Sequence, residues 1–363
     1  MKEESLYPQG KKSVDHSNYD QFLLKNGDIV FARTGATVGK TYMYDEKDGK
    51  LVFAGFLIRY RPNTDILLPY YLQSYTLTPI YLNWVKKVSM RSGQPGINAK
   101  EYSSLKIPLP PLPEQKKIAE ILSTWDITIE KQNELIHQLE LRKRGLMQQL
   151  LTGKKRIKGF NKEWKKYKLQ DIGTTYNGLK GKNKNNFGFG KPYISYLNVF
   201  NNTITDTSSF DYVDVKEHEN QNKVQFGDIF FTVSSETPHE VGMTSVLLEK
   251  LRDTYLNSFC FGFRLNDFSI INPYFIGYYL RNKDFRKKIF KLSQGATRYN
   301  LSKKSVLKIS ITIPTLPEQT AIAEVLTNSD KEIELEKQKL SALQSQKKGL
   351  IQVLLSGKIR VTI

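Results

Sequence analysis

The chain has 363 residues, which is enough for two or three domains that each bury a hydrophobic core. Its single cysteine, Cys260, excludes an internal disulfide framework, and its four histidines lack ligand spacing, so we expect no metal site. The formal net charge of +19 favours a polyanionic partner. Because no apolar run could cross a membrane and no signal peptide is recognisable, we expect a cytoplasmic protein without a membrane partner.

Residues 1–111 form the first predicted globular segment, which mixes strands and helices. The alternation of apolar and polar residues and the positions of glycine and proline define its elements. They are strands at 28–32 and 51–60, a tyrosine-rich helical stretch at 69–88, a turn-forming loop at 91–98 and a proline-rich lead at 107–113. Only 26 residues precede the Gly27-Asp28-Ile29 motif. We therefore expect this segment to be short at its N-terminus.

The first predicted strand is followed by Gly35-Ala-Thr-Val-Gly-Lys-Thr41. The stretch resembles a phosphate-binding P-loop, but it has three residues between its glycines where that motif has four. A loop that touches DNA phosphates or bases is the better functional interpretation, and a plain hairpin turn is the alternative. The candidate DNA-binding residues of the first segment are Arg33, Thr34, Thr37 and Lys40 here and Arg91, Ser92, Gln94 and Asn98 in the second loop.

Residues 112–153 contain a heptad repeat that recurs at residues 316–357, at a constant offset of 204 positions. Steps of four and three residues follow an apolar seam along one face of a helix. The seam comprises Ile118, Leu122, Trp125, Ile129, Ile136, Leu139, Leu146 and Leu150 in the first copy, and Ile322, Leu326, Ile333, Leu340, Leu343, Leu350 and Leu354 in the second. Since neither helix could bury its seam alone, we expect the copies to pair as an antiparallel coiled coil.

The ends of both repeats carry helix start and stop signals. Each copy opens with Pro-Glu-Gln, which suits a first helical turn, and closes at a glycine, Gly153 or Gly357. A helix of this length spans roughly 58 Å at a rise of 1.5 Å per residue. Two unrelated core helices are the alternative, but a shared register over five heptads argues against them.

The positive charge lies outside these helices. The stretches 113–151 and 317–355 hold 11 basic and 12 acidic residues in total, whereas the remainder holds 44 basic and 24 acidic residues, an excess of +20. A basic surface can serve solubility alone. Its concentration in the globular segments makes double-stranded DNA the better hypothesis.

Residues 154–168 form a basic connector, which we expect to be a solvated linker or a contact to phosphates. Residues 169–315 then repeat the first segment in outline. The Gly-Asp-Ile motif recurs at residue 227, a helix opening recurs at Asn272-Pro-Tyr-Phe, and a loop at 294–300 replaces the loop at 91–98. The residues between these anchors differ strongly, as expected of one scaffold that presents two different surfaces.

The second segment supplies the other candidate DNA-binding residues. The stretch 177–190 mixes lysine, asparagine, glycine and aromatic residues, and a disordered solvated loop and a DNA contact are about equally plausible for it. In the loop at 294–300, glutamine and arginine can bind base edges and threonine can pack on a thymine methyl group. The candidates are Asn177, Lys180, Lys182, Lys184, Ser234, Ser235, Gln294, Thr297, Arg298, Tyr299 and Asn300.

No motif indicates catalysis. The stretch Asn272-Pro-Tyr-Phe lacks the second proline of the amino-methyltransferase signature Asn-Pro-Pro-Tyr, and no glycine-rich cofactor loop precedes it. It is more simply the start of a helix. Paired carboxylates, a Ser-His-Asp set and a metal cluster are also not recognisable. We therefore predict no catalytic residue and no cofactor on this chain; a fused methyltransferase is the weakly supported alternative.

Two dissimilar globular segments, each followed by a helix that opens with Leu-Pro-Glu-Gln and ends in Leu-Thr-Gly-Lys or Leu-Ser-Gly-Lys, resemble the specificity subunit of type I restriction-modification systems. The resemblance covers nearly the whole chain. It implies an α+β fold in which two α/β target recognition domains are separated by two long helices that pair as an antiparallel coiled coil, with an internal pseudo-twofold repeat.

The resemblance also implies the division of labour. Residues 1–111 and 169–315 would be the target recognition domains, which read the two halves of a bipartite DNA site, and residues 358–363 a short tail. The helices would dock two methyltransferase subunits, which bind S-adenosylmethionine and methylate adenine, and a restriction subunit can join them. The first segment has no counterpart of Trp164-Lys-Lys-Tyr-Lys-Leu-Gln-Asp-Ile-Gly173. An interfering subunit that reads one half-site or none is therefore the alternative function.

Overall fold

The computed structural model describes residues 18–293, 295 and 298–362. The chain divides into two compact units, each assembled from distant parts of the sequence. Unit 1 comprises Met1–Ile136 and Leu335–Ile363, and unit 2 comprises His137–Glu334. Each unit thus contains one globular lobe together with one end of each long helix. We call the described residues up to 111 lobe 1, and residues 154–315 lobe 2.

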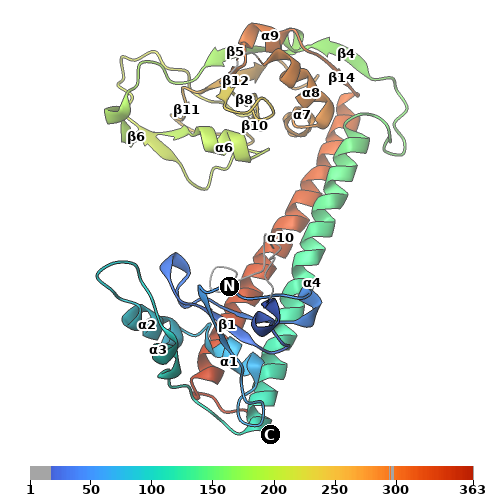
Figure 1. The fold of residues 1–363 in the computed structure, drawn as a ribbon. Coiled ribbons are helices and arrows are strands. Elements are labelled where there is room, and N and C mark those ends of the chain that lie inside the picture. Colours follow the sequence, from blue (N-terminus) through green and yellow to red (C-terminus); the bar gives the residue numbers. More distant parts are fainter. Residues whose placement is uncertain (1–17, 294, 296–297, 363) are drawn as a thin grey trace. The chain divides into compact units, whose positions relative to one another are not determined.

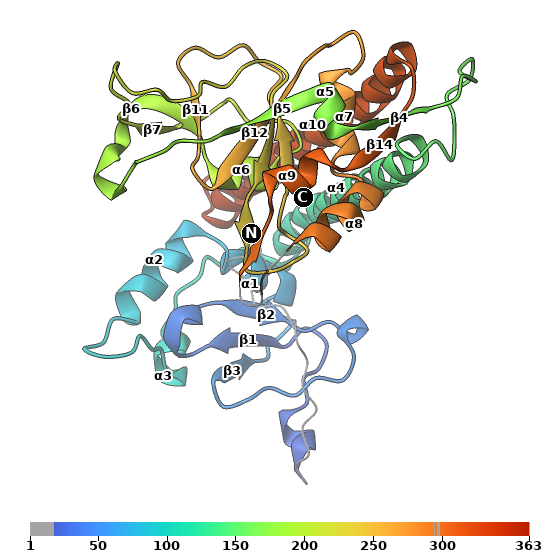
Figure 2. The ribbon, with the colours of Figure 1, turned by 90° about the horizontal axis from the view of Figure 1, so that it is seen from above.

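Lobe 1 is built on a three-stranded antiparallel sheet in the order β2-β1-β3. Its strands are β1 (Ile29–Ala32), β2 (Thr41–Met43) and β3 (Leu57–Tyr60), and its helices are α1 (Pro69–Tyr75), α2 (Pro79–Val88) and α3 (Ala99–Ser103), with 3-10 turns η1 (Tyr19–Phe22), η2 (Gly35–Thr37) and η3 (Glu46–Asp48). Figures 1 and 2 show α2 and α3 on one side of the strands. The central strand β1 is buried along its whole length.

Two predictions for lobe 1 need correction. The helical stretch expected at 69–88 is two helices, because the Thr78 hydroxyl caps α2 by accepting from the Tyr81 N–H at 3.2 Å and Pro79 follows at the first helical position. The strand expected at 51–60 is ordered as β3 only from Leu57 onward. Its earlier part forms a loop with one isolated bridge, between Val52 and Leu23.

Lobe 2 contains the same arrangement with additional strands. Its sheets have the orders β10-β8-β12-β5, β11-β6-β7, β14-β4 and β13-β9. The elements are β4 (Lys165–Lys168), α5 (Leu169–Ile172), β5 (Gly173–Asn177), η4 (Lys184–Asn186), β6 (Phe187–Ile194), α6 (Tyr196–Asn201), β7 (Asp211–Val213), β8 (Ile229–Thr232), β9 (Ser234–Ser235), β10 (Thr244–Val246), β11 (Tyr255–Leu256), β12 (Cys260–Leu265), α7 (Pro273–Tyr279), α8 (Lys283–Leu292), β13 (Tyr299–Asn300), α9 (Lys303–Leu307) and β14 (Ser310–Ile313).

The strand register shows that the lobes are structural repeats. Phe31 of β1 pairs with Ile58 of β3, and Phe231 of β8 pairs with Phe261 of β12 at the equivalent place. Helices α1 to α3 likewise correspond to α7 to α9. Lobe 2 adds β5 on the outer edge of β12 and β4 beside β14. The basic connector, expected to be a solvated linker or a contact to phosphates, therefore ends in a strand.

Helices α4 (Leu112–Leu150) and α10 (Leu316–Leu355) lie side by side within each unit (Figure 1). In unit 1, Asp126 forms an ion pair with Lys347. In unit 2, Lys143 forms the equivalent ion pair with Asp330. The residue numbers of the ion-pair partners fall along α10 as they rise along α4, so the predicted antiparallel pairing is confirmed. Both helices end near Gly153 and Gly357, which adopt positive φ angles of 71° and 72°.

The seam residues are all removed from solvent to some degree. Nine are buried: Ile118, Leu122, Ile136, Leu139, Leu150, Ile322, Leu326, Ile333 and Leu354. Six are half-buried: Trp125, Ile129, Leu146, Leu340, Leu343 and Leu350. Two polar residues of the seam pair across it, since the amide of Gln132 donates to the carboxylate of Glu336 at 2.5 Å. Complementary polar pairs of this kind fix the register of a coiled coil.

Each lobe packs its core onto both helices. In unit 1 the buried cluster joins Tyr71 and Ile97 of lobe 1 to Leu122 of α4 and Leu355 of α10. In unit 2 the cluster joins the sheet residues of lobe 2 to the opposite helix ends in the same way. The helix pair is thus part of two hydrophobic cores. No helix in the described part of the chain is long and apolar enough to span a membrane.

Candidate nucleic-acid interface

A buried aspartate anchors the central hairpin of each lobe. Arg61 donates from Nε and Nη2 to the two carboxylate oxygens of Asp28 at 2.6 and 2.7 Å. Arg264 binds Asp228 in the same way at 2.8 and 2.7 Å. Burial raises the pKa of Asp28, but the hydrogen bonds from Arg61 and the Lys25 N–H, together with the charges of Arg61 and Arg59, leave the pKa below its ordinary value. The repeated Gly-Asp-Ile motif therefore marks a charged anchor, whose arginine partner the sequence alone does not reveal.

In lobe 1 this hairpin brings the two candidate loops together. Thr34 forms an isolated antiparallel bridge with Gly96, and the Ile97 N–H donates to the Arg33 carbonyl at 2.8 Å. The Gly35 N–H donates to the Pro95 carbonyl at 3.0 Å. The loop that follows β1 and the loop at 91–98 thus form one surface.

Lobe 2 repeats this pairing with different side chains. Strand β9 pairs with β13, so that Ser235 lies opposite Tyr299 and Ser234 lies opposite Asn300. The Leu301 N–H extends the ladder by donating to the Val233 carbonyl at 2.9 Å. Gln294 and Thr297, which we predicted as base contacts, lie outside the described residues. The described candidates of this loop are nevertheless brought against the serines that follow β8.

A concave site of about 460 Å³ lies beside this ladder. Its lining combines an apolar wall with acceptors and one cation: Tyr196, Leu197, Phe200, Phe259, Ser234, Ser235, Glu236, Glu240 and Arg298. Leu197 and Phe259 are 65% and 59% exposed, which is high for such side chains. Hydrogen bonds from Thr237 and Ser235 hold the pKa of Glu240 below its ordinary value. The site can therefore offer stacking faces, a guanidinium group and carboxylate acceptors together.

Sequence reasoning missed the apolar wall of this site. Tyr196 and Phe200 stand four residues apart on the short helix α6, and their rings stack at 6.0 Å between centroids. The Tyr196 hydroxyl donates to the Ser234 carbonyl at 2.9 Å, which ties α6 to β9. The spacing of two aromatic residues after the helix-capping Ser195 was the available signal, but it resembles an ordinary core pattern.

Several candidate side chains of lobe 1 are engaged within the fold. Arg91 forms an ion pair with Glu101. Asn98 caps α3 by accepting from the Glu101 N–H at 2.9 Å. Arg33 is exposed, and its side chain donates to the Gly55 carbonyl at 3.5 Å. Thr37, Ser92 and Gln94 are exposed, whereas Thr34 and Lys40 are half-buried. Arg33 and Gln94 are thus better placed to meet a ligand than Asn98.

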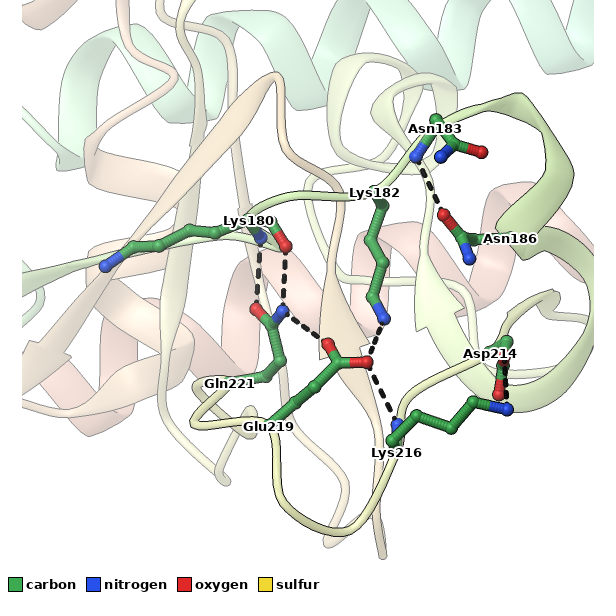
Figure 3. Close-up of polar contacts among 8 residues, drawn as sticks. All are labelled: Lys180, Lys182, Asn183, Asn186, Asp214, Lys216, Glu219 and Gln221. Atoms are coloured by element: carbon green, nitrogen blue, oxygen red, sulfur yellow. Dashed lines mark hydrogen bonds and ion pairs between the residues drawn. The ribbon is translucent and has the colours of Figure 1, made fainter.

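The stretch 177–190, for which disorder was one expectation, forms η4 and the start of β6 between ordered contacts. Figure 3 shows that Lys182 points into a polar network, where its ammonium group pairs with Glu219 at 2.6 Å and its side chain is 4% exposed. Gln221 bonds the backbone of Lys180 through its Oε1 at 3.0 Å and Nε2 at 2.8 Å. Lys182 is therefore engaged within the loop, and its expected DNA contact stays a prediction.

The other candidates of this stretch are either engaged within the fold or exposed. Asn177, the last residue of β5, is half-buried and accepts a hydrogen bond from the Lys303 ammonium group. Its side chain thus links β5 to α9, and its expected DNA contact stays a prediction. Lys180 and Lys184 are exposed and keep their charge on the surface. The lysines available to a polyanion are therefore fewer than the sequence suggests.

The weaker motifs have structural explanations. The stretch 35–41 connects the antiparallel strands β1 and β2, as the hairpin alternative predicts, whereas a P-loop leads into a helix. Asn272 caps α7 by accepting from the N–H groups of Tyr274 and Phe275 at 2.9 and 3.2 Å. Cys260 is buried, and burial raises the pKa of its thiol. Over the described residues, no group of three or more His, Cys, Asp or Glu is placed to hold a metal ion.

Comparisons with known proteins agree with this architecture. The family model of the type I restriction modification DNA specificity domain matches residues 9–141 and 161–345. The putative type I restriction enzyme MjaX specificity subunit of Methanocaldococcus jannaschii is 30% identical over 98% of this chain and 83% of that protein. The MjaVIII specificity subunit of the same organism is 27% identical over 94% of this chain and 81% of its own length.

Solved structures share the fold. The S subunit of a type I restriction-modification system from M. genitalium matches 100% of this chain and 92% of that chain with a TM-score of 0.53 at 17% identity. The HsdS subunit from Thermoanaerobacter tengcongensis matches 93% and 82%, with a TM-score of 0.51. The family model spans both lobes and most of both helices. The chain therefore belongs to the family of type I restriction-modification specificity subunits, in which it is the non-catalytic DNA specificity subunit.

Proposed function

We propose that this chain reads a bipartite DNA target through the two paired-loop surfaces, one in each lobe. The observation that carries the proposal is that the same loop pairing occurs twice with different side chains. Thr34 faces Gly96 in lobe 1, whereas Ser234 and Ser235 face Asn300 and Tyr299 in lobe 2. A repeated scaffold with different residues at the same place is what the recognition of two different half-sites requires.

The exposed side chains at these surfaces fit the chemistry of base edges. Arg298 in lobe 2 and Arg33 in lobe 1 can donate two hydrogen bonds to guanine, and Gln94 or Asn300 can bind adenine. Glu236 and Glu240, which we add to the candidates, can accept from the amino group of cytosine. The exposed Lys180 and Lys184 would bind phosphates and orient the lobe without reading sequence.

We further propose that the helix pair binds the modification subunits of the complex. The helices are nearly neutral, whereas the remaining residues carry an excess of +20 charges. Neutral helices suit a protein partner and basic lobes suit DNA. Two methyltransferase subunits would bind S-adenosylmethionine and methylate adenine, and a restriction subunit could join them. This chain itself would bind no cofactor, and the assembly would act in the cytoplasm, where its DNA substrate lies.

The test is to co-express the chain with its modification subunit and to map adenine methylation across the host genome by direct sequencing. We expect methylation at one motif made of two short sequences separated by a fixed spacer. Replacement of Arg298 by alanine should alter the preference in one half of the motif only. Methylation that ignores sequence, or an assembled complex that methylates no DNA, would contradict the proposal.

A second candidate function rests on the difference between the lobes. Within the described residues, lobe 1 has no counterpart of the segment β4-α5-β5. A chain whose first lobe reads DNA poorly would dock modification subunits yet recognise only one half-site, and would then interfere with a complete specificity subunit. A footprint of the complex distinguishes the two functions. Protection of two separated half-sites excludes the interfering role, and protection of one supports it.

A further inference from the structure

Lobe 2 holds two half-buried arginines in the corner between α7 and α8. Arg281 follows the C-terminal end of α7, and Arg286 lies near the start of α8. Burial lowers the pKa of both guanidinium groups to about 10, from an ordinary value of 12.5. Within the described residues, all seven hydrogen bonds that the two side chains donate end on main-chain carbonyls. Because moving a charge out of water is costly, these carbonyls indicate what the arginines are for.

Arg281 holds the end of the short helix α6. Its Nη2 lies 2.9, 2.9 and 2.8 Å from the carbonyl oxygens of Val199, Phe200 and Asn202, at the C-terminal end of α6. Its Nε donates to the Thr244 carbonyl at 2.5 Å, which ties the same side chain to β10. The last carbonyls of a helix lack partners within the helix, and a cation there opposes the negative end of the helix dipole. Arg281 therefore fixes the helix that carries most of the apolar wall of the concave site.

Arg286 holds the loop between β9 and β10. Its Nη1 donates to the Gly242 carbonyl at 2.5 Å, and its Nη2 donates to the carbonyls of His239 and Val241, both at 2.7 Å. Glu240, which lines the concave site, stands between His239 and Val241 in the chain. Arg286 therefore fixes the backbone on both sides of a candidate base contact.

Lobe 1 shows that the scaffold does not require arginine at these places. Helices α1 and α2 correspond to α7 and α8 at an offset of 204 positions, so Leu77 and Leu82 are the counterparts of Arg281 and Arg286. Both leucines are half-buried and pack against the core of lobe 1. The corner between the two helices can thus be built from apolar side chains. The arginines therefore serve the segments of lobe 2 that they bind.

The turn glycine after the central strand shows this exchange directly. Gly39 and Gly242 hold equivalent places, because each N–H donates to the carbonyl of the last residue of β1 or β8, at 3.0 and 3.1 Å. In lobe 1 the Gly39 carbonyl accepts from the Tyr81 hydroxyl at 2.7 Å. In lobe 2 the counterpart of Tyr81 is Phe285, which has no hydroxyl, and Arg286 binds the Gly242 carbonyl instead.

This replacement suits a longer loop. The connection after the central strand has eight residues in lobe 1, 33–40, and eleven in lobe 2, 233–243. A hydroxyl group donates one hydrogen bond, whereas a guanidinium group carries five N–H donors in a fixed plane. Arg286 can therefore bind three carbonyls of the longer loop at once, and a lysine could not reproduce that geometry.

We infer that Arg281 and Arg286 are positioning residues for sequence readout by lobe 2. They act through α6 and the loop after β9, because their side chains bind the backbone of these two elements. Without the guanidinium groups, the side chains of the concave site lose their fixed places, and correct and incorrect half-sites are bound with more nearly equal affinity. This inference rests on the proposed function and adds to it two residues that act without touching DNA.

The test uses the complex of the full chain with its modification subunit. Competition binding compares the duplex that carries the methylated motif with two duplexes in which one half of the motif is replaced, and so gives a discrimination ratio for each half. Arg281→Lys and Arg286→Lys should each lower the same single ratio by at least about tenfold, because lysine keeps the charge and loses the planar fork. It should be the ratio that Arg298→Ala lowers. Arg252→Lys, at an exposed position of lobe 2, is the matched control and should change neither ratio.

A second measurement separates positioning from a general loss of stability. In hydrogen exchange, Arg281→Lys should speed exchange in peptides of α6, and Arg286→Lys in peptides of residues 236–243, while peptides of β8 and β12 stay unchanged. Affinity for a duplex with both halves replaced should also stay unchanged, because phosphate contacts carry it. Arg281→Gln and Arg286→Gln, which retain amide donors, are the second variants where a lysine unfolds the sheet.

Three outcomes would overturn the inference. If the folded variants discriminate both halves as Arg252→Lys does, the arginines do not position the readout, and the bipartite function stands. If they weaken binding of all duplexes equally and speed exchange throughout lobe 2, their role is stability alone. If the unchanged complex binds all duplexes equally, the proposed function fails and this inference fails with it. Only the last outcome bears on the proposed function, so the two failures are distinguishable.

Discussion

Gln319 joins lobe 2 to the start of α10, and its replacement by alanine should loosen that lobe selectively. The side chain is 0% exposed. Its Oε1 accepts from the Asn272 N–H at 2.9 Å, and its Nε2 donates to the carbonyls of Ile270 and Pro314, both at 2.9 Å. A single amide thus satisfies three backbone groups that precede α7 and α10. Its removal leaves all three without their partner.

The expected loss follows from these contacts. A buried backbone group that loses its partner costs about 1 to 3 kcal/mol of stability. Because Ile270 and Asn272 are not fully buried, water can partly replace the amide, so we expect about 2 to 4 kcal/mol in total rather than the full sum. Gln115 makes the same three bonds, to the Leu68 N–H and to the carbonyls of Ile66 and Pro110. Gln115→Ala should therefore cost a similar amount in lobe 1.

Hydrogen exchange followed by mass spectrometry provides the assay, because it reports on each lobe separately. Gln319→Ala should speed exchange in peptides of α7 and β14, and Gln115→Ala should do so in α1. Gln352→Ala, at an exposed position of α10, is the control and should change neither lobe. The reasoning would be refuted if Gln319→Ala exchanged like the control, or if each variant loosened both lobes equally.

Three other predictions follow from the helix seam, the loop surface and the polar network. Aspartate at the buried Leu139 or at Leu343 should lower the melting temperature by placing an unpaired charge in the helix pair, whereas aspartate at Leu335, 64% exposed, should have little effect; equal melting temperatures would exclude the pairing. Arg298→Ala should weaken binding of one half-site by about 1 to 3 kcal/mol in competition assays, and a uniform loss across sequences would make Arg298 a phosphate contact. Hydrogen bonds from Lys182, Gln221 and the Lys216 N–H lower the pKa of Glu219 to about 2, from an ordinary value of 4.5. The stabilisation by the Glu219 carboxylate should therefore be complete above pH 4.5 and lost as the pH falls through about 2. If the melting temperature of Glu219→Gln showed the same acid dependence as that of the unchanged protein, this prediction would be wrong.

The helix pair could be predicted from the sequence because its signal is local and periodic. Every apolar position of the seam is at least half-buried, from Ile118 to Leu354. The repeated anchors predicted that the two lobes share a scaffold, but the pairing of the two loops in each lobe became visible only in the structure. What periodicity does not supply is the partner of a polar side chain. The bonds of Gln132 to Glu336 and of Asp28 to Arg61 join residues far apart in the chain.

At the candidate site, too, the sequence does not reveal which polar side chains are paired within the fold. Lys182 and Lys184 are equivalent in composition, yet one is paired with Glu219 inside the fold and the other is exposed. Lys182 is paired because the fold places Glu219, 37 positions later in the chain, next to its ammonium group. The pocket beside β9 was missed because Phe259 and Leu197 look like core residues in the sequence, and only the folded lobe shows that they are exposed. Side-chain environment, unlike helical period, is a property of tertiary structure.

The division of roles between repeated and variable residues explains how one scaffold can present different reading surfaces. The bonds that recur in both lobes, Asp28 to Arg61 with Asp228 to Arg264 and those of Gln115 with those of Gln319, hold backbone in place. The side chains at the loop ladder differ between the lobes, and their pairing is carried by the backbone. A substitution at Ser234 or Thr34 therefore leaves the anchors intact, and a change of specificity need not cost stability. Gln115 lies in the first turn of α4 and Gln319 in the first turn of α10, so each ties its lobe to the start of one long helix. New loops can therefore be accommodated without altering the surface proposed for the modification subunits.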